Sequence, residues 1–274
     1  MLAELRRKLA SAKLATFLRR LVRGEQVPIG ANPLCKPVYS GAYGDKPGFL
    51  EAYEMGLKTI EPLGDAGDVF RYDMQRVYVC CWAAKHGLGL EGDFVECGVN
   101  TGFLSRAVMQ YIEFEKHPSR NFHLLDTFTG LDVSQLSPGE RALGFEEVNK
   151  HFYDRDVYEQ VQKTFQNFPN VAIIRGSIPG TLQQCRAESV CYLSLDMNCA
   201  YPELEALAFF YEKLSPSAWV ILDDYGFNPY IHQRKALDGF AKDMGIDILE
   251  LPTGQGIIVK ALGVSESHSR AEMS

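Results

Sequence analysis

Acidic residues stand at or next to the carboxyl ends of four short apolar segments in this chain of 274 residues. These segments have the length and the branched apolar residues of buried strands. In open α/β sheets, ligands bind outside the carboxyl ends of the strands. Carboxylates gathered at that edge indicate a bound cation, a bound ribose, or both. The acids are Glu96, Asp126, Asp196 and the pair Asp223 and Asp224.

A glycine-containing turn follows the first of these segments, with the sequence Glu96-Cys97-Gly98-Val99-Asn100-Thr101-Gly102. The two glycines allow a tight turn and the close approach of a ligand. A helix that begins near Gly102 points free N–H groups at such a ligand. The spacing is not that of the dinucleotide-binding fingerprint. We predict a cofactor site in which Glu96 accepts hydrogen bonds from an ammonium group, together with Gly98, Asn100, Thr101 and Gly102; the alternative is a purely structural turn.

The next two segments extend this cofactor site. Asp126 lies thirty residues after Glu96, where a carboxylate can accept hydrogen bonds from both hydroxyls of a ribose. The alternative is that Asp126 caps a turn, because Thr127 and Thr129 follow it. Gly176 and Ser177 come after the next segment and can border an adenine ring, or form a plain turn. The predicted cofactor residues here are Asp126, Thr127, Gly176 and Ser177, with Asp196 further along the chain.

The last two acidic positions predict a metal site. Asp196 and the pair Asp223 and Asp224 each end a predicted strand, so their side chains can meet in one pocket. Three adjacent carboxylates repel one another unless a cation lies between them. Hard oxygen ligands suit Mg²⁺ or Ca²⁺, and such an ion can lower the pKa of a bound hydroxyl. The alternative is that one acid of the pair only caps a turn.

Strands alternate with helices along the chain, which predicts an α/β fold of the Rossmann-like kind. We expect a mostly parallel seven-stranded sheet with helices on both faces and an antiparallel last strand, since a short turn joins the final two strands. The predicted strands are 94–97, 122–125, 171–174, 190–195, 218–222, 246–251 and 256–260. The predicted helices are near 48–59, 70–88, 102–115, 154–167, 202–214 and 230–244.

The domain organisation follows from composition. We expect an amphipathic helix and an irregular arm in 1–68, a catalytic domain in 69–262 with a lid or insertion at 127–153, and a disordered tail at 263–274. Residues 1–23 carry seven basic residues against one glutamate, on a helix with apolar residues at helical spacing. Such a helix can lie on an anionic membrane surface, or it can pack on the domain or on a second subunit.

Composition excludes several classes of protein. The net charge of −7 argues against a general nucleic-acid binder, which needs a surplus of Lys and Arg. The seven cysteines are odd in number and form no Cys-x-x-Cys pair, which favours a reducing cytoplasm. No apolar stretch is long enough to span a bilayer, and the N-terminus lacks the features of a signal peptide.

Residues 70–260 resemble the macrocin-type (TylF-like) O-methyltransferases, which methylate sugar hydroxyls in antibiotic pathways. The matching stretches are FVECGVNTG at 94–102, LLDTFTGL at 124–131, IIRGSIPGTL at 173–182, LSLD at 193–196 and LSPSAWVILDDYG at 214–226. The resemblance implies a class I methyltransferase fold, an S-adenosylmethionine site at Glu96, Gly98, Gly102, Asp126 and Ser177, and a Mg²⁺ site at Asp196, Asp223 and Asp224. It also implies a small-molecule or glycan acceptor.

One position departs from the family pattern. The family reads Asp-x-Asp-x-Tyr, and the second Asp is its proposed general base; this chain has Asn198 there. An amide cannot accept a proton at neutral pH, so another group serves as base, or metal activation suffices, or the acceptor differs. His232 follows the Asp-Asp pair and has a suitable intrinsic pKa, so we predict it as a catalytic residue beside Asp196.

Two other functions compete with methyl transfer. An oxidoreductase or epimerase that binds NAD or a nucleotide sugar needs the Gly-x-Gly-x-x-Gly turn and usually a Tyr-x-x-x-Lys pair, and the sequence has neither. A binding protein that has kept the fold and lost catalysis is favoured by Asn198 alone.

Overall fold

The alternating pattern forms a single mixed sheet in the computed structural model, which describes residues 43–262. The predicted helix within 1–23 and the predicted tail at 263–274 lie outside the described residues. The strands are β1 (Asp93–Cys97), β2 (Phe122–Asp126), β3 (Val171–Arg175), β4 (Val190–Leu195), β5 (Leu214–Leu222), β6 (Leu249–Glu250) and β7 (Gly256–Val259).

The strand order is β3-β2-β1-β4-β5-β7-β6. The first five strands in this order pair in parallel, and β7 runs antiparallel to both β5 and β6. This confirms the predicted seven-stranded, mostly parallel sheet with an antiparallel end. Because neighbouring parallel strands end at the same edge, the residues that follow β1, β2, β4 and β5 are brought together there.

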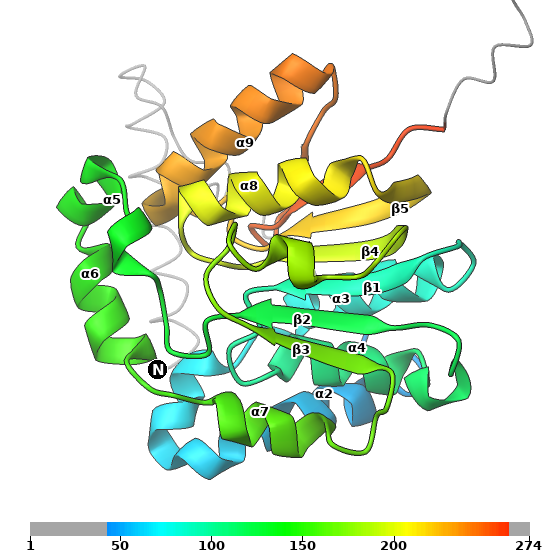
Figure 1. The fold of residues 1–274 in the computed structure, drawn as a ribbon. Coiled ribbons are helices and arrows are strands. Elements are labelled where there is room, and N and C mark those ends of the chain that lie inside the picture. The colour runs from blue at the N-terminus through cyan, green and yellow to red at the C-terminus, as the bar shows by residue number, and fades with distance from the viewer. Residues whose placement is uncertain (1–42, 263–274) are drawn as a thin grey trace, which may run out of the picture. The chain divides into compact units, whose positions relative to one another are not determined.

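Helices cover both faces of the sheet (Figure 1). On one face α3 packs against β4 and β5, α4 packs beside α3, and α2 packs on α4; on the other, α8 lies against β4 with α9 beside it. The helices are α2 (Phe49–Ile60), α3 (Met74–Gly87), α4 (Phe103–Tyr111), α5 (Pro138–Ala142), α6 (Phe145–Val148), α7 (Tyr158–Phe165), α8 (Ala200–Tyr211) and α9 (Ile231–Met244). None of the described helices is both long and apolar enough to cross a bilayer.

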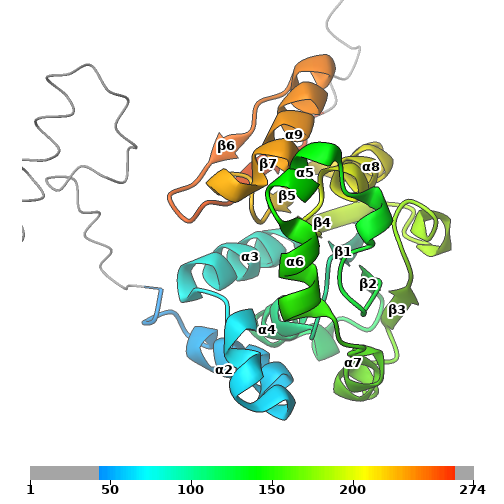
Figure 2. The same ribbon diagram turned by 90° about the vertical axis from the view of Figure 1, so that its left-hand side faces the viewer.

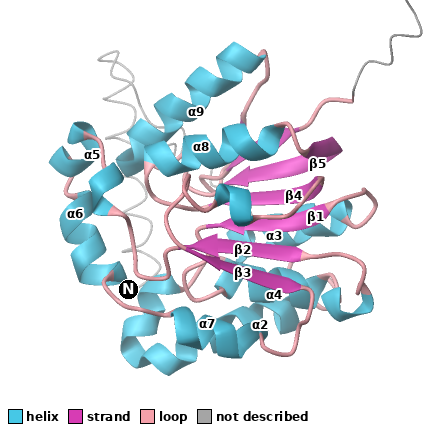
Figure 3. Cartoon of the chain, in the orientation of Figure 1, coloured by secondary structure: helices cyan, strands magenta, loops and turns pink. Residues whose placement is uncertain are grey.

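The segment between β2 and α7 is more helical than the polar insertion predicted for 127–153. It contains α5, α6 and a π-helical turn at Asn149–Tyr153, joined by loops (Figure 3). Ser137 and Glu140 form a capping box that satisfies the first N–H groups of α5. Figure 2 looks onto the carboxyl ends of the strands, and α5 and α6 lie in front of them. We call residues 127–157 the lid segment.

Several boundaries differ from the sequence-based prediction, and two of them have a clear physical reason. The helix predicted from residue 70 begins at Met74, because Asp73 accepts a hydrogen bond from the Gln75 amide at 2.8 Å and caps it. A compact unit begins at Lys46, whereas the predicted domain boundary was 68/69. In this unit α2 packs on α4, so the second half of the expected arm belongs to the helical layer of the domain.

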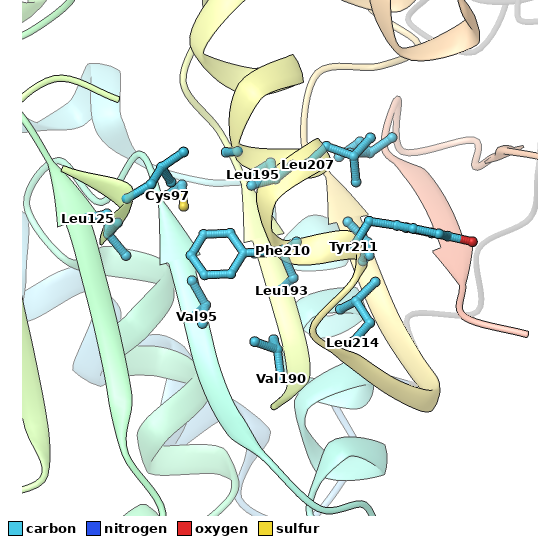
Figure 4. Packing of buried hydrophobic residues seen from close by; sticks show 14 of the residues in the cluster. Val95, Cys97, Leu125, Val190, Leu193, Leu195, Leu207, Phe210, Tyr211 and Leu214 are labelled. Atoms are coloured by element: carbon cyan, nitrogen blue, oxygen red, sulfur yellow. The ribbon is translucent and has the colours of Figure 1, made fainter. Parts of the chain in front are cut away.

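One aromatic ring lies in the middle of the core on the α8 side of the sheet (Figure 4). Phe210 of α8 is fully buried, and its ring lies over β1 and β4 among Val95, Leu193 and their neighbours (Figure 4). A buried phenylalanine at the centre of a packed layer contributes both its transfer free energy and the contacts that a cavity would remove.

We expect Phe210→Ala to lower the free energy of unfolding by about 3–5 kcal/mol, the usual cost of truncating a buried aromatic ring. The adjacent Phe209 is only half-buried, so Phe209→Ala is the matched control, with an expected cost of about 1 kcal/mol. Urea unfolding followed by circular dichroism measures both. Equal losses for the two variants would contradict the packing described here.

Candidate active site

Strand register brings the last three predicted acids together. Cys97 of β1 lies level with Leu195 of β4, which lies level with Leu222 of β5. Asp196 and Asp223 are the next residues on their strands, and their amides continue the ladder with hydrogen bonds of 2.9 Å. One oxygen each of Asp196, Asp223 and Asp224 lies within 4.8 Å of the others. We call these three residues the acid triad.

The acid triad places three carboxyl groups in a largely buried site, where ionised carboxylates are costly. Asp223 and Asp224 are buried and Asp196 is partly exposed. Burial, followed by the charges of Asp223 and Asp224, raises the pKa of Asp196 well above its ordinary value. Burial and the charge of Asp223 raise the pKa of Asp224 to about 6. Three hard oxygen donors at this spacing, short of positive charge, fit a divalent cation such as Mg²⁺.

Two residues that the sequence analysis missed hold Asp223. The Arg76 guanidinium, on α3, bonds with Nη2 to a carboxylate oxygen of Asp223 and lies 3.0 Å from an oxygen of Asp224. Gln255, fully buried in the β6–β7 turn, donates from Nε2 to the other oxygen of Asp223 at 3.0 Å. No local sequence signal identifies either residue, because both reach Asp223 through tertiary packing.

Asp196 has its own partners. The Tyr72 hydroxyl donates to one of its oxygens, and the Asn198 amide nitrogen lies 3.3 Å from the other. Asn198 has a φ of 54°, a left-handed conformation that asparagine adopts more readily than most residues. At the position of the family's base, this chain therefore has an amide donor turned toward Asp196.

The predicted glycine turn is required by packing. Gly98 has a φ of 88°, and a Cβ atom there would lie 2.0 Å from the Asp196 carbonyl oxygen. Gly102 has a φ of 84° at the start of α4, and a Cβ atom would lie 2.7 Å from the Phe165 ring. The buried hydroxyl of Thr101 is 3.2 Å from that of Thr59 on α2. The turn therefore holds the backbone close to the edge of the sheet. The Thr101 side chain contributes to the packing of this turn against α2.

Glu96 is a buried carboxyl group beside this turn. It is 1% exposed and accepts a hydrogen bond of 2.7 Å from the Ser105 hydroxyl of α4. Burial raises the pKa of Glu96 to about 8; the Ser105 hydrogen bond opposes this rise, and the charges of Asp126 and Asp223 add to it. The carboxyl group is thus poised to ionise when a positive group comes near it.

Asp126 ties the glycine turn to the end of β2. One of its oxygens accepts from the amides of Val99 and Asn100 at 2.6 and 2.8 Å. The other accepts from the Phe128 amide and, at 3.3 Å, from the Thr127 hydroxyl. In this conformation Asp126 therefore caps turns by accepting hydrogen bonds from backbone amides, as the alternative interpretation of the sequence proposed. A carboxylate has about four lone-pair sites, so contact with a ribose requires one of these donors to be exchanged.

A cavity of about 430 Å³ lies beside Asp126, within the range of small-molecule sites. Three of its lining residues, Thr127, Gly176 and Ser177, were predicted. Asp132 of the lid segment was not predicted; it accepts a hydrogen bond of 2.8 Å from the Ser177 hydroxyl. Hydrogen bonds from Ser134 and Ser177 lower the pKa of Asp132, so the cavity presents an ionised acceptor.

His232 faces the lid segment. It lies in the first turn of α9, and its ring packs so closely on α5 that a Cβ atom at Gly139 would lie 2.2 Å from it. Among the described residues, we find no hydrogen bond or ion pair between His232 and the acid triad. Its geometry is that of a packing contact, and its predicted catalytic role gains no support from it.

Aromatic rings surround the acid triad. Burial and the nearby aspartate charges raise the pKa of Tyr153 and Tyr230. Tyr230 packs edge-on against Phe145 of α6, with ring centres 5.1 Å apart. The Phe227 ring lies 4.9 Å from the guanidinium carbon of Arg76. Carboxylates flanked by rings can bind the hydroxyls and the apolar face of one small ligand.

Comparisons with known proteins identify the family and the fold. Residues 71–249 match the model of the macrocin-O-methyltransferase (TylF) family. No curated protein matches the chain. Among solved structures, the O-methyltransferase NovP is 21% identical with a TM-score of 0.60, covering 69% of this chain and 81% of NovP.

Two further structures share the fold at lower identity. The calicheamicin methyltransferase CalS11 is 16% identical with a TM-score of 0.51, covering 78% of this chain and 93% of CalS11. A putative caffeoyl-CoA O-methyltransferase from Staphylococcus aureus is 12% identical with a TM-score of 0.50, covering 74% of this chain and 92% of that one. The family match runs from the start of α3 to β6, and the chain therefore belongs to the macrocin-O-methyltransferase (TylF) family of S-adenosylmethionine-dependent methyltransferases.

Proposed function

We propose that this chain transfers the methyl group of S-adenosylmethionine to a hydroxyl of a sugar or a sugar-containing acceptor, with assistance from Mg²⁺. The observation that carries the proposal is the position of the acid triad. It lies at the edge of the sheet where the glycine turn, Glu96 and Asp126 also meet, so a methyl donor and an acceptor hydroxyl can be held side by side.

We assign the cofactor residues by chemistry. Glu96 would receive the ammonium group of the methionine end, because its buried carboxyl gains most from a positive partner. Asp126 would receive the ribose after exchange of the Thr127 hydroxyl, which is its most distant donor. The cavity lined by Asp132 and Ser177 would hold the adenine ring. Gly98 and Gly102 keep the turn close enough for these contacts.

The acid triad would hold the metal ion. When bound, Mg²⁺ would lower the pKa of an acceptor hydroxyl and fix its direction. Asp196 is the only one of the three that is partly exposed, so it is the residue we assign to receive the hydroxyl proton. The Tyr72 hydroxyl and the Asn198 amide contact its two carboxylate oxygens, and a carboxylate held in position can accept a proton from an acceptor hydroxyl.

A sugar acceptor is supported by the family and by the rings around the triad. Members of this family are macrocin-type O-methyltransferases. CalS11, whose fold is similar, is described as a TDP-rhamnose 3′-O-methyltransferase. Tyr72, Tyr153 and Tyr230 offer flat apolar surfaces and hydroxyls near the carboxylates. These groups suit a polyhydroxylated ring better than a wholly apolar acceptor.

Asn198 favours one alternative, a protein that binds the cofactor and its partner without transferring the methyl group. Only methyl transfer releases S-adenosylhomocysteine, so measuring its release distinguishes the enzyme from the binding protein. We expect turnover from labelled S-adenosylmethionine with one or more members of a panel of nucleotide sugars and glycosides, and a fall in rate after chelation of divalent ions. Cofactor binding without transfer to any member of the panel would favour the binding protein.

The pH dependence of cofactor binding tests the role of Glu96. Its pKa of about 8 leaves it mostly protonated at pH 6.5 and ionised above pH 8. We expect the affinity for S-adenosylhomocysteine, measured by calorimetry, to rise from pH 6.5 to 8.5 by up to about tenfold per unit. Glu96→Gln should bind more weakly with a flat profile, and Ser105→Ala should move the wild-type profile to higher pH. A flat wild-type profile would refute the assignment.

Two substitutions at neighbouring positions test the proton acceptor. Asp196→Asn should lower kcat by about 10²–10⁴-fold, the usual contribution of a general base, and leave a folded protein. Asn198→Gly is the matched control, since glycine tolerates the positive φ and removes only a hydrogen bond of 3.3 Å. It should change kcat by no more than about fivefold, because a single long hydrogen bond is worth about 1 kcal/mol. A large loss from Asn198→Gly with little loss from Asp196→Asn would reverse the assignment.

A further inference from the structure

Arg76 lies where a cation would be needed in the acid triad. Its Nη2 atom bonds to a carboxylate oxygen of Asp223, to the Asp223 carbonyl oxygen at 2.7 Å and to an oxygen of Asp224 at 3.0 Å. One nitrogen thus bridges the two adjacent carboxylates. The side chain is only 16% exposed, so the contact is largely shielded from water.

A metal ion held by Asp223 and Asp224 would compete with Arg76 for the same two carboxylates. An ion held by Asp223 and Asp224 would lie against the same carboxylates that Nη2 now contacts, and two cations at that distance repel each other. When all three carboxyl groups are ionised, they carry more negative charge than one guanidinium neutralises. A divalent ion would therefore replace Arg76 with a net gain in charge balance.

The surroundings of Arg76 suit a side chain that moves. Its Nε atom is buried without a hydrogen-bond partner among the described residues, so the seated position leaves one donor unsatisfied. The guanidinium carbon lies 4.9 Å from the Phe227 ring centre and 5.9 Å from that of Tyr72. The Phe227 ring is 41% exposed and already contacts the seated guanidinium, so this cation–π contact could be kept while Nη2 leaves the carboxylates.

We propose that Arg76 is the resident counter-ion of the acid triad: it stabilises the metal-free protein and is displaced when a divalent cation binds. This inference rests on the proposed metal site. It makes Arg76 a positioning residue that sets the affinity of the site for its ion, with no contact to the reacting atoms.

The test is the binding of Mn²⁺ alone to the full chain, followed by calorimetry and by electron paramagnetic resonance. Arg76→Gln keeps a polar side chain without charge, and it should bind Mn²⁺ at least about tenfold more tightly than the wild type. Its metal-free melting temperature should be lower, because two buried carboxylates lose their partner, and Mn²⁺ should raise it by more than in the wild type. Arg106→Gln, a change on α4 away from the triad, should match the wild type in Mn²⁺ affinity.

Each other outcome is decisive. Equal or weaker Mn²⁺ binding by Arg76→Gln overturns the counter-ion role while leaving the metal site in place. If neither protein binds Mn²⁺, the counter-ion role and the metal site are both overturned. Asp224→Asn, which lacks one of the proposed ligands, should then bind Mn²⁺ no more weakly than the wild type. If Arg76→Gln does not fold, Arg76→Met takes its place. Methionine keeps an unbranched apolar side chain and removes the charge, so this variant should also bind Mn²⁺ more tightly than the wild type.

Discussion

Mutual repulsion among three carboxylates within 4.8 Å of one another is the constraint that organises this site. The parallel register of β1, β4 and β5 forces Asp196 and Asp223 to the same edge, and Asp224 follows directly. Inside a protein, such charges are costly unless donors or cations face them. Arg76 offsets the repulsion with its positive charge. Hydrogen bonds from three different parts of the chain offset it further; they come from Tyr72, Asn198 and Gln255.

The same edge would also form the cofactor side of the proposed site, through backbone contacts. Asp126 collects the amides of the glycine turn, and that turn lies so close to the Asp196 carbonyl that only glycine fits at position 98. The two sides of the site therefore share one rigid support. A shift of the glycine turn would disturb Asp126 and Asp196 together, which links cofactor binding to the geometry of the acid triad. The lid segment completes the enclosure with α5 and α6 across the strand ends.

The sheet and its acidic edge could be predicted from the sequence because both depend on local pattern. Short apolar runs that end in Glu96, Asp126, Asp196 or Asp223 give the strands, and parallel pairing then places the acids together. The family resemblance rested on the same stretches. A helix start at a capping aspartate shifted one boundary by a few residues, as in the case of Met74.

The partners of the acids could not be predicted, because they come from elsewhere in the chain through tertiary packing. Arg76 reaches the triad from α3, some 150 residues away in sequence, and Gln255 from the β6–β7 turn. Nothing in the local pattern distinguishes Arg76 from a surface arginine. The short helices of the lid segment were missed for a similar reason, since helices of four or five residues depend on their caps and contacts more than on propensity. His232 was predicted from its residue type and its place in the sequence, but its position against Gly139 follows from packing.

The central claim is that the sheet edge holds a methyl donor and a divalent ion next to each other. A crystal structure of the full chain with S-adenosylhomocysteine and Mn²⁺, with anomalous differences collected at the manganese edge, tests it most directly. We expect one anomalous peak in contact with Asp196, Asp223 and Asp224. We also expect a ligand that reaches from Glu96 to the cavity beside Asp126. A ligand bound elsewhere, or an acid triad without an anomalous peak at saturating Mn²⁺, would contradict it.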